Sequence, residues 1–150
     1  MALRHTYFSA NGLNPMPWLD RRLNPYRHAT TVNLRGQPVH VQWTRRAQAA
    51  LDRRTDPLCV EMQLYFSCVV KKRVLFHEPP DPHVYTRVVA ALRLRASAVE
   101  SDVCSPEDFA AGYPARRELE TKAALRMVPR SLWLDYCHGE WVGEMGFDSR

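Results

Sequence analysis

One short segment of the sequence concentrates side chains that bind metals or move protons. HEPPDPH, residues 77–83, places two imidazoles and two carboxylates on a loop stiffened by three prolines. Three such ligands converging on one point would suit zinc or iron. The same residues also suit a solvated turn after a strand, because short loops rarely aim alternate side chains at one point. A metal-dependent enzyme or a metal carrier is therefore one functional hypothesis.

Cysteines could extend this site. Cys68 falls in an apolar row between Phe66 and Val70, where a free cysteine commonly behaves as a small buried hydrophobic residue. Cys137 and His138 form a second thiol–imidazole pair, which would matter only if another ligand approached in space. Because we expect a cytoplasmic protein, thiols, metal ligands or core residues are expected rather than a disulfide framework, and no CxxC pair is present. The candidate ligands for iron or zinc are His77, Glu78, Asp81, His83, Cys68 and Cys137.

Basic doublets recur along the chain and offer a different chemistry. The sequence holds 21 Lys and Arg against 16 Asp and Glu, a net charge of +5, which favours acidic partners such as nucleic acid. If the doublets share one surface with Tyr65, they could hold phosphates beside an aromatic ring that stacks on bases. Scattered doublets are more often a solvated face, and no known nucleic-acid motif accompanies them. The candidate contacts are Arg45, Arg46, Arg53, Arg54, Lys71 and Arg73.

Two alternating segments predict β-hairpins that would support these sites. TTVNLRGQPVHVQW turns at Arg35-Gly36, pairs Val32 with Val39, and places its apolar side chains on one buried face. SLWLDYCHGEWVGEMGF turns at His138-Gly139. One face of this second hairpin is aromatic and aliphatic, and the other, which includes Trp133 and Glu144, is mixed.

The region from Leu58 to Phe76 predicts a core strand, because apolar residues recur at every second position and so point to one face. A single strand of this length would exceed the width of so small a domain, so we expect a break at Lys71-Lys72-Arg73. A three-residue loop there keeps the apolar residues on one face, as would a sharply bent continuous strand. Cys59, Glu61 and His77 then lie on the opposite, more polar face.

Three helices are expected. Thr44 can cap a short helix that follows it directly. Ser105-Pro106 begins a second helix that Gly112 ends, and residues 115–127 form a third. Residues 83–99 fit both a helix and a strand, and the strand is favoured.

Together these elements predict an α+β fold, with an antiparallel or mixed β-sheet built from hairpins and short helices packed on one face. Residues 29–150 would form this single domain, and residues 1–28 an irregular N-terminal arm. No run of about 20 apolar residues is present to span a bilayer, and the start lacks an apolar signal. We therefore expect a cytoplasmic protein without membrane contact. Standard nucleotide-binding and catalytic motifs are absent from the sequence.

The run VHVQWTRRAQAALDRRTDPLCVEMQLYFSC resembles the opening of the HesB-like, A-type iron–sulfur carrier fold, with a strand, a Thr-capped short helix and a strand ending at a cysteine. VLFHEPPDPH is similar to that family's next strand and its acidic turn, and LDYCHGEWVGEMGF to its late glycine-containing segment. Only Cys68 maps to a ligand position. The family's terminal CxC pair and the glycines around its first cysteine are missing, and a cluster needs about four ligands. The resemblance implies a fold relative that has lost the standard cluster site.

Three functions follow from the sequence. The first, which we prefer, is a small soluble binding or scaffold protein without an evident catalytic site, a degenerate HesB-like protein related to iron–sulfur or metal handling. It would act through a protein partner or as a homodimer. The second is a basic nucleic-acid-associated protein. The third is a metal-dependent enzyme that uses the HEPPDPH loop.

Overall fold

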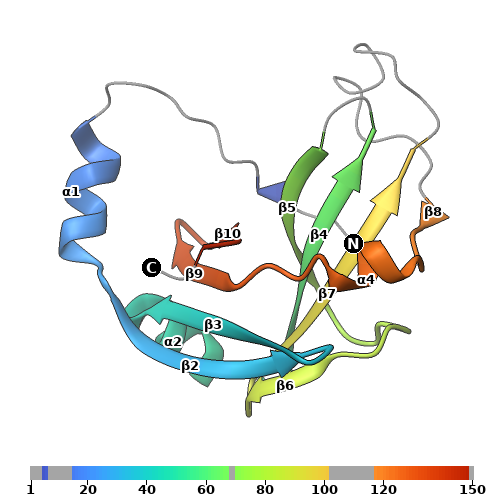
Figure 1. Ribbon diagram of the computed structural model, residues 1–150. Coiled ribbons are helices and arrows are strands. Elements are labelled where there is room, and N and C mark those ends of the chain that lie inside the picture. The colour runs from blue at the N-terminus through green and yellow to red at the C-terminus, as the bar shows by residue number, and fades with distance from the viewer. Residues whose placement is uncertain (1–4, 7–14, 68–69, 102–116, 149–150) are drawn as a thin grey trace.

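The protein contains two mixed β-sheets and a few short helices, as a computed structural model shows for residues 5–6, 15–67, 70–101 and 117–148 (Figure 1). The first sheet contains β1 (His5–Thr6), β4 (Leu58–Phe66), β5 (Val70–His77), β6 (Thr86–Val89), β7 (Leu92–Glu100) and β8 (Arg117–Glu118). The second sheet contains β2 (Tyr26–Leu34), β3 (Gln37–Thr44), β9 (Ser131–Cys137) and β10 (Glu140–Gly146). The described helices are α1 (Pro15–Leu23), α2 (Arg45–Asp52) and α4 (Lys122–Arg126).

Strand order explains why both sheets are mixed. The first sheet runs β1-β5-β4-β7-β6, with β8 also on β7, and the second runs β10-β9-β3-β2. Within them, β4 is parallel to β7 and β3 is parallel to β9, while their other neighbours are antiparallel. The sequence predicted one sheet of this kind, whereas the structure has two. None of the described helices is long and apolar enough to cross a membrane.

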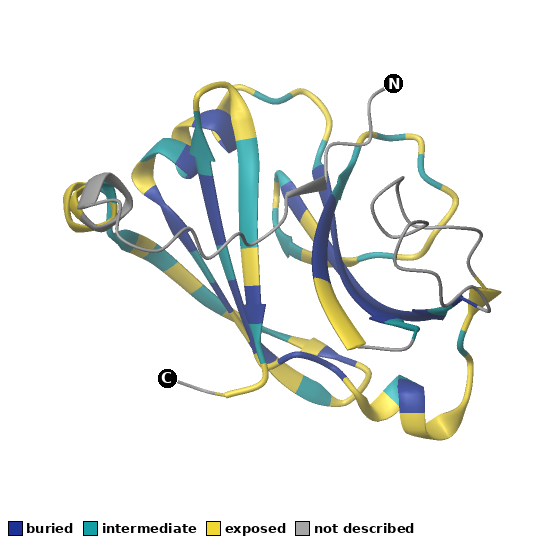
Figure 2. Cartoon of the chain, turned by 90° about the horizontal axis from the view of Figure 1, so that it is seen from above, coloured by how far each residue is buried: buried dark blue, intermediate teal, exposed yellow. Residues whose placement is uncertain are grey.

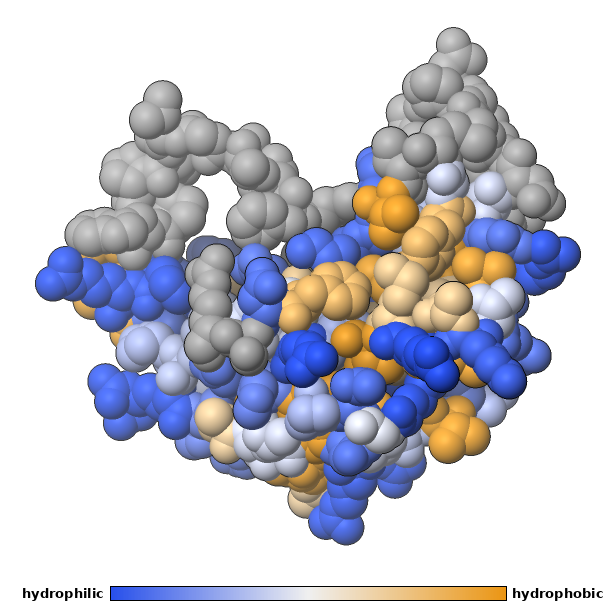
Figure 3. All heavy atoms as spheres, in the orientation of Figure 1, coloured by the Kyte–Doolittle hydropathy of each residue, from blue (hydrophilic) through white to orange (hydrophobic). Residues whose placement is uncertain are grey.

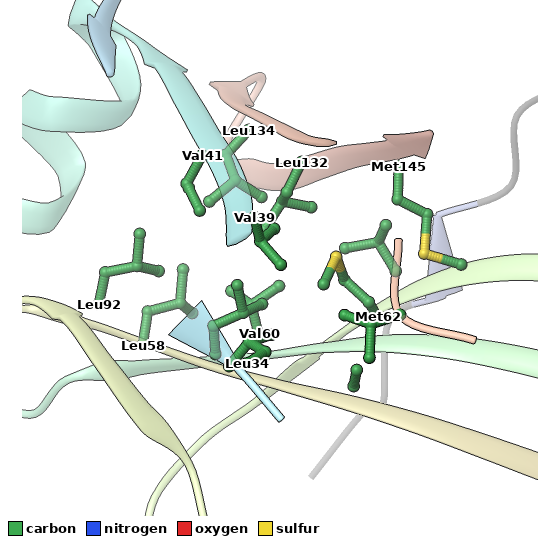
Figure 4. Packing of buried hydrophobic residues seen from close by; sticks show 14 of the residues in the cluster. Leu34, Val39, Val41, Leu58, Val60, Met62, Leu92, Leu132, Leu134 and Met145 are labelled. Atoms are coloured by element: carbon green, nitrogen blue, oxygen red, sulfur yellow. The ribbon is translucent and has the colours of Figure 1, made fainter. Parts of the chain in front are cut away.

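The apolar faces of the two sheets share one core. Val39, Val41 and Leu132 of the second sheet belong to the same buried cluster as Val60 and Met62 of the first (Figure 4). Figure 2 shows the buried residues concentrated on the strands, with exposed residues on α1 and the connecting segments. Burial of each large apolar side chain contributes about 1.5–3 kcal/mol, so this contact is the main source of stability.

Both short hairpins have the expected register. Val32 pairs with Val39 across the first turn, and Cys137 pairs with Glu140 across the second. In each turn the first residue and the glycine after it have positive φ, between 51° and 79°. Two-residue hairpin turns of this kind need positive φ at both positions, which is why glycine follows Arg35 and His138.

The strand pair predicted between Leu58 and Phe76 turns at a different place. Phe66 pairs with Val70, so the chain reverses direction between these two residues and the basic triplet lies within β5. Alternation alone could not locate this turn, because shifting a register by an even number of residues keeps every side chain on its face. A turn at the triplet would also have put Pro79 and Pro80 into the ladder, where they cannot donate hydrogen bonds. Cys68 lies outside the described residues.

Other predicted elements differ in type or extent. The region over residues 83–99 contains strands, as favoured, with β6 and β7 joined by a short turn. The prediction of a helix over residues 115–127 is wrong for most of the described part of this range. β8 pairs with β7 at its start, and only five residues are helical. Pairing with a neighbouring strand, supported by the ion pair of Arg117 with Glu100, outweighs local helix propensity. The helix expected between Ser105 and Gly112 lies outside the described residues.

The N-terminal arm is not irregular throughout. Residues 15–23 form α1, and the helix ends where the Asn24 amide donates to the Asp20 carbonyl at 2.8 Å. Pro15 and Pro17 lie in its first turn, where a helix needs no N–H. β2 then begins at Tyr26, before the predicted boundary.

Gly143 on β10 lies directly against β5 of the other sheet. A Cβ added to it would stand 2.6 Å from Cγ1 of Val74 and 3.1 Å from Cζ of Phe76. Gly143→Ala is therefore expected to lower the free energy of unfolding by about 1–3 kcal/mol, measured by urea denaturation. Val74→Ala removes the clashing atom, so the double variant should lose less than the sum of the single variants. Additive losses would contradict this contact.

Candidate functional site

The predicted metal segment brings three of its side chains together. Nδ1 of His77 lies 3.7 Å from Oδ2 of Asp81. Oδ1 of Asp81 lies 2.8 Å from Nδ1 of His83 and also accepts from the His83 amide at 2.9 Å. Glu78 instead pairs with Arg54. The loop therefore folds back on the end of β5, with one of its two carboxylates between the two histidines.

Glu61 on β4 completes this cluster, and sequence reasoning missed it. Only 5 % of Glu61 is exposed, and its Oε2 lies 2.7 Å from Nε2 of His77. Its Oε1 accepts from Oγ of Ser97 and from Nε2 of Gln63 at 3.2 Å. Burial alone would raise the pKa of Glu61, but hydrogen bonds from His77 and Ser97 and the charge of Arg95 lower it to about 2.

The alternation of residues along β4 assigns Glu61 to the polar face of the strand, and such a face is normally solvated. In the structure that face of the first sheet is also buried, and all but the last residue of β4 are buried on both sides. Gln63 and Ser97 are each 4 % exposed. Buried polar groups must be hydrogen-bonded to one another, and a glutamate inside a long apolar strand was the available signal for such a network.

Within its described residues the structure does not gather the candidate iron or zinc ligands into one site. Over the described ranges, no three His, Cys, Asp or Glu side chains are placed to hold a metal. Nε2 of His77 is engaged by Glu61, Glu78 is paired with Arg54, and Cys137 lies on β9 of the other sheet. The cluster instead holds the 77–83 loop against the sheet. A metal that uses Cys68 stays a prediction, because that residue is outside the described part.

The six predicted nucleic-acid contacts divide between internal and exposed positions. Arg46 binds two carboxylates, Arg54 binds Glu78, and Arg73 is buried and donates to Oε1 of Gln63 at 3.0 Å. The exposed ones are Arg45, Arg53 and Lys71. Tyr65 is fully buried, so the aromatic ring expected to stack on bases is inaccessible. Nucleic-acid binding stays a prediction.

Asp135 on β9 anchors two helices to the second sheet. It is buried and accepts from Oγ1 of Thr44 at 2.6 Å and from Nε and NH2 of Arg46 at 2.8 and 2.6 Å. The same guanidinium binds both carboxylate oxygens of Asp20 on α1, at 3.0 and 2.6 Å. Thr44 also caps α2, as predicted, by accepting from the Ala47 amide at 3.2 Å.

The electrostatics of this anchor favour its ionised form. Burial would raise the pKa of Asp135, but hydrogen bonds from Arg46 and Thr44 hold it below its usual range. Hydrogen bonds to Asp135 and Asp20 in turn raise the pKa of Arg46. A bidentate guanidinium between two carboxylates is a strong, directional contact. It therefore fixes α1 relative to β9.

A pocket of about 600 Å³ lies beside this anchor. Its floor is a row of side chains across three adjacent strands, with Gln42 next to Trp133 and Trp133 next to Glu144. Arg21 of α1 and Tyr26 of β2 line it as well. The remaining lining residues include Lys72, Phe147 and Asp148. The volume is in the range of small-molecule sites.

Contacts within the pocket lining hold its aromatic rings in place. A Cβ on Gly146 would lie 3.2 Å from two ring atoms of Trp133, so the indole rests directly on the glycine. The Arg21 guanidinium carbon lies 4.3 Å from the centre of the Tyr26 ring, a cation–π contact. Burial raises the pKa of Tyr26 to about 12, so its phenol stays protonated and can donate.

Sequence reasoning missed this pocket. Trp133 and Glu144 had been placed on the mixed face of the second hairpin, which was the signal available. Arg21 and Tyr26 come from the arm that was expected to be irregular, and only the Asp135 anchor brings them to that face.

Other features of the described surface support a site less well. Figure 3 shows hydrophilic residues around α1 and hydrophobic residues gathered over the ends of β4, β5 and β7. A smaller pocket of about 320 Å³, lined by Arg35, Val84, Arg95 and Glu118 among others, lies between the first hairpin and β6–β7. In this pocket Arg95 is already bound to Glu118 at 2.5 Å and lies 3.7 Å from Glu61.

Comparison with known proteins identifies no relative, because no family model, curated protein or solved structure matches the chain. The function must therefore be argued from the geometry. The resemblance to the HesB-like fold stays a prediction.

The Glu61 cluster should make stability sensitive to acid. The pKa of Glu61 falls from 4.5 to about 2 on folding, so its contribution is complete above about pH 4.5 and is lost as the pH falls toward 2. That contribution is about 3 kcal/mol. Glu61→Gln should flatten the pH dependence of unfolding in this window, as urea denaturation between about pH 6 and pH 2 would measure. The exposed Glu140→Gln is the control, and an unchanged pH profile in Glu61→Gln would refute this role.

Proposed function

We propose that this is a binding protein that takes a small molecule in the pocket between α1 and the β3–β9–β10 face. The observation that carries the proposal is a single pocket of about 600 Å³ that combines aromatic rings with cationic and acidic side chains. This agrees with the binding role preferred from the sequence. It requires no metal and no catalytic group.

Aromatic side chains favour a ligand with a planar ring. Trp133 is half-buried and Phe147 is 39 % exposed, so both present ring surface at the pocket. Stacked or edge-on ring contacts contribute about 0.5–1.5 kcal/mol beyond the burial of area. Since Gly146 supports the indole from below, little ordering entropy is lost when a ligand packs on it.

The charges favour a ligand that carries both signs. Arg21 and Lys72 contribute positive charge to the lining, and Glu144 and Asp148 contribute negative charge. The two carboxylates would repel a purely anionic ligand, and the two bases would repel a purely cationic ligand. A zwitterion with a ring, such as an aromatic α-amino acid, can satisfy both sets by charge-assisted hydrogen bonds.

The other polar cluster supports a ligand less well. Both carboxylate oxygens of Glu61 already have hydrogen-bond partners, so a ligand would have to displace internal contacts. The pocket beside α1 has a smaller cost, because Glu144 and Lys72 are exposed and the ion pair of Arg21 with Asp135 is long, at 3.9 Å.

Isothermal titration calorimetry with three indole probes tests this function. L-tryptophan is a zwitterion, indole-3-propionate an anion and tryptamine a cation. We expect L-tryptophan to bind with a dissociation constant on the order of 1 mM or tighter, and about tenfold tighter than either singly charged probe. Glu144→Gln should weaken L-tryptophan about tenfold without weakening indole-3-propionate, because of these two probes only L-tryptophan offers an ammonium group.

The matched control is Glu140→Gln, which removes a carboxylate from the same strand outside the pocket. It should leave all three affinities unchanged. Trp133→Ala should abolish binding of every probe. The absence of binding by all three probes, or binding that Trp133→Ala does not weaken, would contradict the proposal.

A further inference from the structure

β2 is the outer strand of the second sheet, and its far edge has no strand partner among the described residues. Residues 28–34, with the sequence HATTVNL, contain no Lys, Arg, Asp, Glu or Pro. Natural sheets usually protect an edge of this length with such residues, because its unpaired backbone groups are a template for another strand. The irregularity between Tyr26 and His28 protects only the start of the strand.

The first hairpin determines which backbone groups face this edge. A two-residue turn makes Leu34 and Gln37 a hydrogen-bonded pair, and such pairs alternate with non-hydrogen-bonded ones along an antiparallel ladder. Asn33 is therefore in a non-hydrogen-bonded pair, and its partner Pro38 needs no N–H there. The N–H and C=O groups that point away from β3 belong to Ala29, Thr31 and Asn33.

Side chains leave this edge accessible. Ala29, Thr31 and Asn33 are exposed and small or uncharged, and Oγ1 of Thr31 is directed toward Nδ1 of His40 on β3 at 2.9 Å. An approaching strand meets neither a charge nor a bulky group between Ala29 and Asn33. Figure 1 shows β2 along the border of the second sheet, with β6 near its end.

We propose that β2 pairs antiparallel with β2 of a second copy of this chain, which joins the two second sheets across a two-fold axis. Identical antiparallel strands are self-complementary, because each outward N–H meets an outward C=O of the same set. A register centred on Thr31 would place Arg27 opposite the partner's Arg35, which like charge disfavours. A register centred on Thr30 pairs Ala29 with the partner's Thr31 and avoids that contact.

This dimer does not depend on the proposed ligand. Ala29 lies beside Gln42, so the partner strand would extend the row that forms the pocket floor. A contact made of a few backbone hydrogen bonds, each weak on balance, gives a concentration-dependent dimer with a dissociation constant on the order of 100 µM.

Sedimentation equilibrium between about 10 µM and 1 mM protein, without ligand, tests the proposal. The wild-type mass should rise from 17.4 kDa toward twice that value. Thr31→Pro removes an N–H that the hairpin does not use, and Thr31→Lys adds a charge to the edge, so both should stay monomeric. Far-ultraviolet circular dichroism verifies that each variant is folded, and Thr31→Lys suffices if the proline variant is not.

The matched control is His40→Lys, which adds the same charge to the neighbouring strand, opposite Thr31 but away from the edge. It should dimerise like the wild type. A wild-type mass of 17.4 kDa at every concentration would overturn the proposal, as would self-association that Thr31→Lys leaves intact or that continues beyond two copies.

Discussion

The burial of two apolar sheet faces against each other is the contact on which the rest of the structure depends. Each strand alternates, so the side chains that enter the shared core cannot also bind a ligand. The sheets approach so closely that β10 has a glycine opposite Val74 and Phe76. Groups with useful chemistry must therefore lie on the two outer faces, and these faces differ in what they contain.

On the first sheet, the outer face is closed by its own polar network. Glu61 has a cation or a donor on each side, which compensates the cost of burying its charge. The network holds the 77–83 loop in place, and its members are largely occupied by one another. The segment with the strongest chemical signal in the sequence is thus held by internal contacts.

On the second sheet, the outer face remains open enough for a ligand. The Arg46 guanidinium connects Asp135 of β9 with Asp20 of α1, and Arg21 follows directly in the helix. A buried charge pair of this kind contributes less to stability than to a defined arrangement. Here the arrangement puts a helix wall beside Trp133 and Glu144, and the pocket results from it.

Sequence patterns correctly predicted the structural features that depend only on residues close together in the chain. The two hairpins follow from two-residue turns with a second-position glycine, and the α2 cap follows from Thr44. Long-range contacts decided the rest. The alternation of apolar and polar residues could not locate the β4–β5 turn, because shifting the strand register by an even number of residues leaves the alternation unchanged. Around Glu118, pairing with a neighbouring strand overrode helix propensity. Asp135 and Arg46 are 89 positions apart, so nothing near either residue indicated their contact or the pocket beside it.

The most direct test of this account is to map where L-tryptophan binds by amide chemical-shift changes in a ¹⁵N-labelled sample. The account predicts that the changes concentrate at Arg21, Tyr26, Trp133 and residues 144–148, with little change along β4 and β7. Changes centred on Glu61, His77 and the 77–83 loop would contradict it, because they would place the binding site on the outer face of the first sheet.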